Sequence, residues 1–253
     1  MSTLICQVNS RLPVAAVALY GTLDRSSAPR MTVTLRDCLA EAPTVLLLDV
    51  EHLVVASASA FAPLFGLVEE SRGWPATRFA LCGASPAITG LIAAAGPDSG
   101  GLELYSTIAV GTDAARQVPV SPRRSLGLRP DANAPAISRQ FAQETCATWG
   151  VDKVGMLAEL IASELVTNAV VHARTHVDVT MRLADGVLSV AVRDGDPRPM
   201  FRPAESGIEA VTSEHGRGLL LLDAMADAWG CHPTGDGKVV WASIGVSKSA
   251  RQR

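Results

Sequence analysis

The sequence predicts an α/β protein with two domains, and three observations support this fold class. In the first part of the chain, short apolar strand-like runs alternate with stretches of helical spacing. In the last part, two helical stretches precede a series of strand-like runs. Between the two parts, residues 113–133 are rich in Pro and Arg and poor in large apolar residues, which is typical of a linker. We therefore expect domains at 1–112 and 134–247 and a solvated tail at 248–253.

The first domain is expected to be a sheet with helices packed on it, because strands and helices alternate along it. Ser85 followed by Pro86 indicates a helix start, with serine as the N-cap and proline in the first turn. The expected strands are Val14 to Tyr20, Thr44 to Val50 and Arg78 to Cys82, and the expected helices are Met31 to Glu41, Ala58 to Arg72 and Ser85 to Ala95.

The second domain is expected to begin with two helices and to continue as a hairpin. Asp185 and Gly186, between two alternating runs, are typical of a tight turn. A proline-rich loop follows, and then a helix that opens at Gly216. The expected helices are Ala136 to Trp149 and Lys153 to Ala173, and the expected strands are Thr175 to Leu183, Val187 to Asp194 and Lys238 to Val246.

The composition favours a cytoplasmic protein that contacts neither nucleic acid nor membrane. The formal net charge is −3 and only 4% of the residues are aromatic, so neither a polyanion-binding surface nor a base-stacking module is indicated. The five cysteines are scattered and form no C-x-x-C pair, which disfavours a disulfide framework or a zinc site. The N-terminus has no signal-peptide pattern, and the apolar runs are too short to span a bilayer.

The helix expected from Lys153 to Ala173 is apolar almost all round, which predicts that it is buried. Glu164, Asn168 and His172 nevertheless follow one another at four-residue steps, so they share one stripe of this helix. Buried polar residues are costly unless they are paired or bind something. One interpretation is an internal network, such as Glu164 with an arginine. The other is that the stripe lines a pocket, where a carboxylate and a carboxamide serve a hydroxyl and Mg²⁺.

Two further signals lie downstream of this helix. Asp194 and Gly195 come at the end of a strand, where a carboxylate can accept a hydrogen bond from an exocyclic amine; turn chemistry explains the same residues equally well. The run Gly216, Arg217, Gly218 and Leu219 then enters a helix, where backbone amides can approach phosphates. A lone G-x-G is more often an ordinary loop, but the three signals together favour a nucleotide site.

The stretch from Glu164 to Ala173, ELVTNAVVHA, resembles the N-box of the ATPase/kinase superfamily that includes gyrase, histidine kinases and anti-sigma-factor serine kinases. Asp194 lies where the first glycine box of that superfamily begins, and Gly216 to Leu219 resembles the second. The run from Gly237 to Ala242, GKVVWA, is similar to the ending of bacterial anti-sigma regulatory kinases. The resemblance extends over about Ala134 to Val246, in the expected order.

This resemblance implies a Bergerat-type sandwich of helices on a mixed, largely antiparallel sheet, with ATP and Mg²⁺ as cofactors. Glu164 would be the general base, Asn168 the Mg²⁺ ligand and Asp194 the adenine contact. The other implied nucleotide-binding residues are His172, Gly195, Gly216, Arg217, Gly218 and Leu219. The sequence departs from the pattern at Asp196 and Pro197, where many relatives have a further glycine.

The first domain more faintly resembles a STAS domain, the fold of anti-sigma-factor antagonists. Laid on the antagonist pattern, Ser59 falls at the phosphorylated serine, which makes it a candidate phosphoacceptor. Ser57 replaces the acid of that pattern and Ala60 replaces its glycine. An ordinary small residue in the first turn of a helix is the better explanation of Ser59 from the sequence alone.

The leading hypothesis is an ATP-dependent serine/threonine protein kinase of the anti-sigma type, which phosphorylates an antagonist-like STAS partner. The alternative is a nucleotide-gated binding module that sequesters a sigma factor or an antagonist without turnover. A topoisomerase-type ATP hydrolase is the third and weakest reading. The fusion also implies docking of the STAS-like half on the kinase half in cis, and a homodimer is left open.

Overall fold

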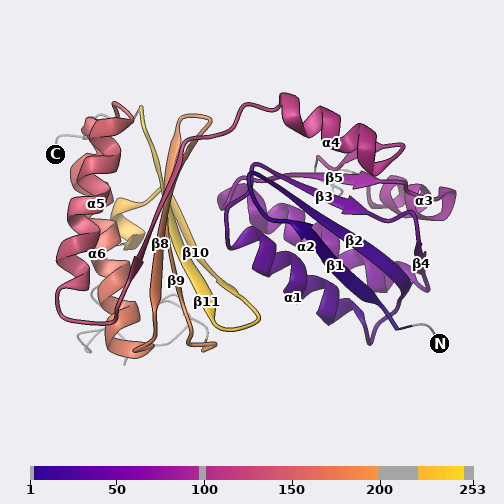
Figure 1. Ribbon diagram of the computed structural model, residues 1–253, viewed down its shortest axis with the longest axis horizontal. Coiled ribbons are helices and arrows are strands. Elements are labelled where there is room, and N and C mark those ends of the chain that lie inside the picture. Colours follow the sequence, from indigo (N-terminus) through magenta and orange to yellow (C-terminus); the bar gives the residue numbers. More distant parts are fainter. Residues whose placement is uncertain (1–2, 97–100, 199–221, 248–253) are drawn as a thin grey trace. The chain divides into compact units, whose positions relative to one another are not determined.

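The structure is a computed structural model that describes residues 3–96, 101–198 and 222–247. The chain divides into two compact units, Met1–Val120 and Ser121–Arg253 (Figure 1). Each unit has a hydrophobic core of its own. Both units combine a sheet with packed helices, so the predicted α/β fold class is confirmed. The expected tail, 248–253, lies outside the described residues.

The first unit is a mixed sheet in the order β1-β2-β3-β5-β6, with β4 pairing β2. The β1–β2 pair is antiparallel and the remaining pairs are parallel. Its elements are β1 (Ile5–Ser10), β2 (Val14–Leu23), α1 (Ala28–Leu39), β3 (Val45–Asp49), β4 (Leu53–Val55), α2 (Ala58–Gly73), β5 (Arg78–Cys82), α3 (Pro86–Ala95), β6 (Glu103–Tyr105) and α4 (Ile108–Gln117).

Both faces of the first sheet are covered, as expected for parallel strands. Successive residues of β3 point to opposite faces: Leu46 and Leu48 pack in the core with α1, α2 and α3, whereas Val45 and Leu47 pack with Ala115 of α4. Ser85 caps α3 as predicted, because its hydroxyl accepts a hydrogen bond from the amide of Ile88. The sequence did not indicate β1, β4, β6 or α4.

The second unit is an antiparallel sheet in the order β10-β11-β9-β8-β7, with two helices on one face. Its elements are β7 (Arg123–Leu128), α5 (Ala134–Thr148), the short 3₁₀ helix η2 (Asp152–Val154), α6 (Gly155–His172), β8 (Val177–Ala184), β9 (Val187–Asp194), β10 (Ala228–Pro233) and β11 (Lys238–Gly245). The predicted hairpin is confirmed, since β8 and β9 pair across a turn in which Asp185 has φ 50° and Gly186 has φ 73°.

The stretch predicted as a linker, residues 113–133, is structured instead. It contains the end of α4 and the whole of β7, which pairs with β8 along its length. Strand β7 was missed because one position on its helix-facing side is Arg124, between few apolar residues. The Arg124 guanidinium lies over the ring of Phe141, 5.2 Å from its centroid, and thereby covers the core as an apolar side chain would.

The central helix of the second unit is the longest apolar segment of the described chain. Asp152–His172 is long and apolar enough to cross a membrane by length and composition alone, so the expectation that every apolar run is too short to span a bilayer is wrong for this helix. Half of that window is buried within the fold, where α6 packs against α5, β8, β9 and β11. A core helix of this kind passes the same test as a membrane span, so its apolar character is explained by the packing.

Candidate functional site

The polar stripe of α6 lies along one side of a helix whose other side is buried. The buried side packs on the sheet and on α5, and it includes Ala158, Ile161, Ala162, Leu165, Val166 and Ala169. On the stripe, Glu164 and Asn168 are partly buried and His172 is exposed. The predicted burial all round the helix is therefore wrong. Met156 and Leu160, on the same stripe, are 82% and 40% exposed, because the sheet covers only one side of α6.

Among the described residues, the side chains of Glu164 and Asn168 take no part in the hydrogen-bond network of the fold. Within the described residues, the Glu164 carboxylate has neither a hydrogen bond nor an ion pair. The arginine that reaches α6 from α5, Arg139, donates instead to the hydroxyl of Ser163, 3.4 Å away. The side-chain nitrogen of Asn168 is buried without a partner. The alternative of an internal Glu164–arginine network is thus not realised among the described residues.

His172 lies at the end of α6, where the helix meets the segment that follows β9. Its backbone carbonyl accepts a hydrogen bond from Arg198, 3.4 Å away. Arg198 also holds the carboxylate of Asp196, at 2.9 Å from its Nε. The segment that follows β9 therefore reaches the end of α6. At 1.5 Å rise per residue, Asn168 and Glu164 lie about 6 and about 12 Å back along the helix from this point.

Asp194 is the last residue of β9 and is 5% exposed. Its Oδ1 accepts two hydrogen bonds, from the Asp196 amide at 2.8 Å and from the Lys238 ammonium at 3.0 Å. The first of these bonds is the turn chemistry that the sequence left open. Strand alternation places Asp194 with Val190 and Val192 on the face that α6 covers.

Lys238 is a functional candidate that the sequence reading missed. It opens β11 directly opposite Asp194 and is only 5% exposed. A lysine at the start of an otherwise apolar strand, directly after Gly237, was the available signal. Its meaning depended on the β9–β11 register, which the sequence did not supply. The neighbouring Gly237 is required by close packing, because a Cβ there would collide with the backbone oxygen of Asp194.

The glycines of the predicted site divide into one that is described and two that are not. Gly195 donates its amide to the Thr175 hydroxyl at 2.8 Å, and a Cβ on it would meet that side chain at 3.1 Å. Packing against Thr175 therefore accounts for this glycine without a ligand. Four predicted nucleotide-binding residues, Gly216, Arg217, Gly218 and Leu219, lie outside the described residues.

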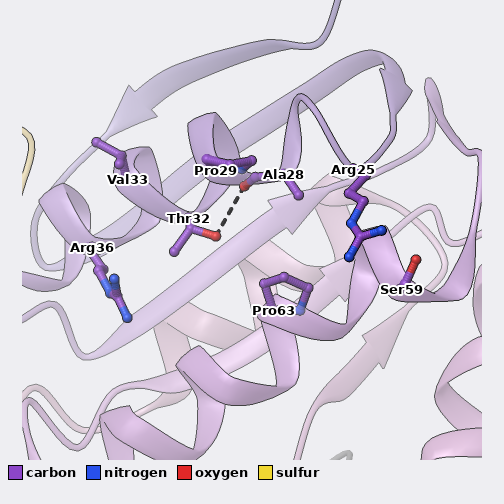
Figure 2. Close-up of a pocket in the computed structure, with 8 residues that line it drawn as sticks. All are labelled: Arg25, Ala28, Pro29, Thr32, Val33, Arg36, Ser59 and Pro63. Atoms are coloured by element: carbon purple, nitrogen blue, oxygen red, sulfur yellow. Dashed lines mark hydrogen bonds between the residues drawn. The ribbon is translucent and has the colours of Figure 1, made fainter.

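Ser59, the candidate phosphoacceptor, lies in the first unit, in the first turn of α2. It is exposed, and its hydroxyl is 3.1 Å from that of Ser57. A pocket of about 400 Å³ opens beside it between α1 and α2, with Pro63 in its lining. Figure 2 shows the side chain of Arg25, at one end of this pocket, directed toward Ser59. A cation therefore faces the hydroxyl.

Comparison with known proteins places the second unit in a family. The model described as a histidine kinase-like ATPase domain matches residues 128–244. An uncharacterized protein of Streptomyces coelicolor is 40% identical over 82 residues, which are 31% of this chain and 75% of that protein.

Solved structures also show similarity. An anti-sigma factor antagonist from Mycobacterium paratuberculosis has 22% identity and a TM-score of 0.39, over 46% of this chain and 96% of its own. The antagonist SpoIIAA in its unphosphorylated form has 17% identity and a TM-score of 0.39, over 46% and 99%. The RsbU and RsbW domains of a Mycobacterium tuberculosis protein have 20% identity and a TM-score of 0.36, over 48% and 31%.

The match over residues 128–244 covers both the stripe on α6 and the strand-end Asp194. It confirms the family resemblance predicted from the motifs that begin at Glu164. Through this domain, the chain belongs to the histidine kinase-like ATPase domain family.

Proposed function

We propose that this chain is a cytoplasmic, ATP-binding regulator of an anti-sigma-factor pathway. It transfers the γ-phosphoryl group of Mg-ATP to a serine or threonine of an antagonist-like STAS partner. The observation that carries the proposal is the pair Glu164 and Asn168, a carboxylate and a buried amide nitrogen without partners among the described residues. A polar group that is partly buried without a hydrogen-bond partner is explained when a bound ligand supplies that partner.

The described residues fit the nucleotide that the family implies. Mg²⁺ takes few protein ligands and keeps waters and phosphate oxygens in its shell, so the carboxamide oxygen of Asn168 is a suitable protein contribution. The unpaired Nδ2 of the same side chain is a donor, which a phosphate oxygen can accept from. No group of three or more His, Cys, Asp or Glu side chains that could hold a metal occurs in residues 3–96, 101–198 and 222–247.

Each residue has a distinct task in this proposal. Glu164 accepts the proton of the attacking hydroxyl, and Asp194 accepts a hydrogen bond from the exocyclic amine of adenine. When bound, Mg-ATP supplies the phosphoryl group, with its charge neutralised by the ion. The amides of Gly216 and Gly218 would approach the phosphates, with Arg217 and Leu219 between and beyond them, while His172 and Gly195 border the site.

The test is transfer of labelled γ-phosphate to candidate STAS proteins, with Glu164→Gln as the central variant. The glutamine keeps the shape of the side chain but cannot take the proton. We expect ATP affinity to stay near the wild-type value and transfer to fall by about 10²–10⁴-fold, the usual contribution of a general base. Glu159→Gln, on the same helix, is the matched control and should transfer normally. Wild-type transfer rates in Glu164→Gln would remove the general-base assignment.

A second function is favoured by one observation at the first glycine box. Asp196 stands where the family pattern has a glycine. Its carboxylate forms ion pairs with Arg198, at 2.9 Å, and with Lys238, at 3.4 Å. A segment held by ion pairs at Asp196 is suited to a binding module. In such a module ATP sets the conformation, and a sigma factor or an antagonist is sequestered. Partner binding that depends on ATP, with no labelled phosphate on any partner, would select this alternative.

Ser59 is proposed as a phosphoacceptor in the same chain, which would make the first unit a substrate in cis. Its exposure and the facing Arg25 support this proposal. Mass spectrometry after incubation with Mg-ATP should find phosphate on Ser59 and none in Ser59→Ala. If the separately produced units neither bind each other nor exchange phosphate, docking in cis is excluded.

A further inference from the structure

Lys238 is the centre of a buried ion cluster that joins β11 to the end of β9. Its ammonium donates to Asp194 Oδ1 at 3.0 Å and to the backbone carbonyl of Asp196 at 2.9 Å, and it lies 3.4 Å from Asp196 Oδ2. The side chains of Lys238, Asp194 and Asp196 are 6%, 3% and 11% exposed. Two donor positions of the ammonium are therefore hydrogen-bonded within one short segment, and the third contact with that segment is an ion pair.

The cluster is balanced in charge. Arg198 pairs with the Asp196 carboxylate, so two cations face two carboxylates. Hydrogen bonds from Arg198 hold the pKa of Asp196 below its usual value. A buried lysine is unfavourable unless its charge is paired and hydrogen-bonded, and Lys238 has both ion pairs and hydrogen bonds to this segment. Within the described residues, the charge of Lys238 is thus compensated by the two carboxylates of the fold.

The same bonds leave Asp194 with two different oxygens. Both of its hydrogen bonds, from Asp196 and from Lys238, fall on Oδ1. Within the described chain, Oδ2 receives none. Two donors on one oxygen prevent the carboxylate from rotating about its axis, so Oδ2 has a fixed direction. Because Asp194 lies on the face of the sheet that α6 covers, this fixed acceptor belongs to the side of the sheet that carries the candidate site.

We propose that Lys238 is a positioning residue: by holding Oδ1 of Asp194, it fixes Oδ2 as the acceptor for the exocyclic amine of the base and so sets the preference for adenine. This inference rests on the proposed nucleotide site. It also gives a reason for the departure from the family pattern, because Asp196 provides Lys238 with a carbonyl and a carboxylate that hold the turn in place.

The experiment compares ATP with purine riboside triphosphate, which is identical except that it lacks the 6-amino group. Dissociation constants are measured by titration calorimetry with Mg²⁺ present. We expect wild type to prefer ATP by about 10- to 100-fold, the value of one hydrogen bond to a charged acceptor. In Lys238→Met the preference should fall below about 3-fold, while affinity for purine riboside triphosphate changes little. A merely structural loss would weaken both ligands together.

Lys153→Met makes the same substitution at an exposed lysine of the same unit and should keep the wild-type preference. Wild type that prefers ATP together with Lys238→Met that retains the full preference would overturn the positioning role and leave the proposed function intact. Equal affinity of the wild type for both ligands would also overturn the positioning role and leave the proposed function intact. If wild type binds neither triphosphate, the proposed nucleotide site fails and this inference fails with it.

A second measurement needs no substitution at Lys238, in case that variant does not fold. The chain has three lysines, Lys153, Lys238 and Lys248, so ¹⁵N-lysine labelling gives an ammonium spectrum that is simple to assign. The hydrogen-bonded Lys238 ammonium should be protected from exchange, and its signal should move more with ATP than with purine riboside triphosphate. Equal movement with both ligands would overturn the inference.

Discussion

Two groups of polar side chains belong to the helix-covered side of the second sheet, and they differ in what satisfies them. Asp194, Asp196 and Lys238 bind one another at 2.8–3.4 Å and form a closed cluster. Glu164 and Asn168, on α6, have no side-chain partner in the described part of the chain, although the Asn168 nitrogen is buried. The first group is therefore completed by folding, and the second is left for something that binds.

The difference separates residues that build the site from residues that act in it. Removing a member of the closed cluster leaves a buried charge uncompensated, so it should affect the folded state first. Glu164 and Asn168, the open pair, have no side-chain partner among the described residues, so removing either should affect ligand binding first. Stability without nucleotide is the property on which the two groups should differ most.

The largest expected effect is that of Lys238→Met, which leaves the Asp194 carboxylate buried without its cation. Breaking a buried pair by removing one partner costs about 3–5 kcal/mol in the free energy of unfolding. Urea denaturation followed by circular dichroism measures this change. Lys153→Met, at an exposed lysine, should stay within about 0.5 kcal/mol of wild type. A Lys238→Met protein as stable as wild type would show that the cluster contributes nothing to the fold.

Gly237→Ala should have the next largest effect. A Cβ at this position would collide with the backbone of Asp194 and Gly195, so the ends of β9 and β11 must separate. Overpacking of this kind costs about 1–3 kcal/mol. Gly90→Ala, in α3, is the contrasting control: its Cβ meets nothing within 4 Å, and alanine favours a helix, so that variant should be slightly stabilised. Denaturation midpoints of the two variants should therefore move in opposite directions.

Asn168→Ala should change the stability of the nucleotide-free protein by less than about 1 kcal/mol. The buried amide nitrogen has no partner to lose, and alanine is the better helix former by about 0.5 kcal/mol. Thermal unfolding without nucleotide measures this. A decrease of about 2 kcal/mol or more in the free energy of unfolding is expected for a hydrogen-bonded buried polar group. That result would show that Asn168 has a structural role in the fold.

The smallest expected effect concerns acid. Hydrogen bonds from Arg198 lower the pKa of Asp196 from the ordinary value of 3.8, so its contribution to stability is present above that value and is lost as the pH falls below it. Stability of the wild type should therefore fall more steeply below about pH 4 than that of Asp196→Asn. The effect is small, because the Arg198 side chain is 74% exposed. If the free energy of unfolding falls equally with pH in both proteins, the ionised Asp196 carboxylate does not stabilise the cluster.

Local sequence signals predicted much of the fold. Asp185 and Gly186 indicated the β8–β9 turn because a type I′ turn needs positive φ at both positions, and both residues have it. Helix α6 was expected from Lys153 to Ala173, a long, mostly apolar stretch that contains no proline. Strand β7 was missed because Arg124 occupies a core-facing position, where its charge hides the alternation. Strand β10 was missed as well, since Gly230 and His232 interrupt its apolar pattern.

The site was predicted only where its chemistry is local in sequence. Glu164 and Asn168 are one helical turn apart, so their shared stripe follows from the helix period. Lys238 is 44 residues from Asp194, and its role arises from the β9–β11 register. No helix or strand period encodes that pairing. The burial of α6 was overestimated for a related reason, because composition does not reveal how much of a helix a sheet covers.

The central claim is that the second domain holds Mg-ATP at Asn168, and the most direct test is the thermal shift with ATP in the presence and absence of Mg²⁺. For wild type we expect ATP to raise Tm and Mg²⁺ to raise it further, because a ligand at 100 times its Kd stabilises by about 2.7 kcal/mol. Asn168→Ala should keep the shift with ATP alone and lose the increment from Mg²⁺. An equal Mg²⁺ increment in both proteins would contradict the account.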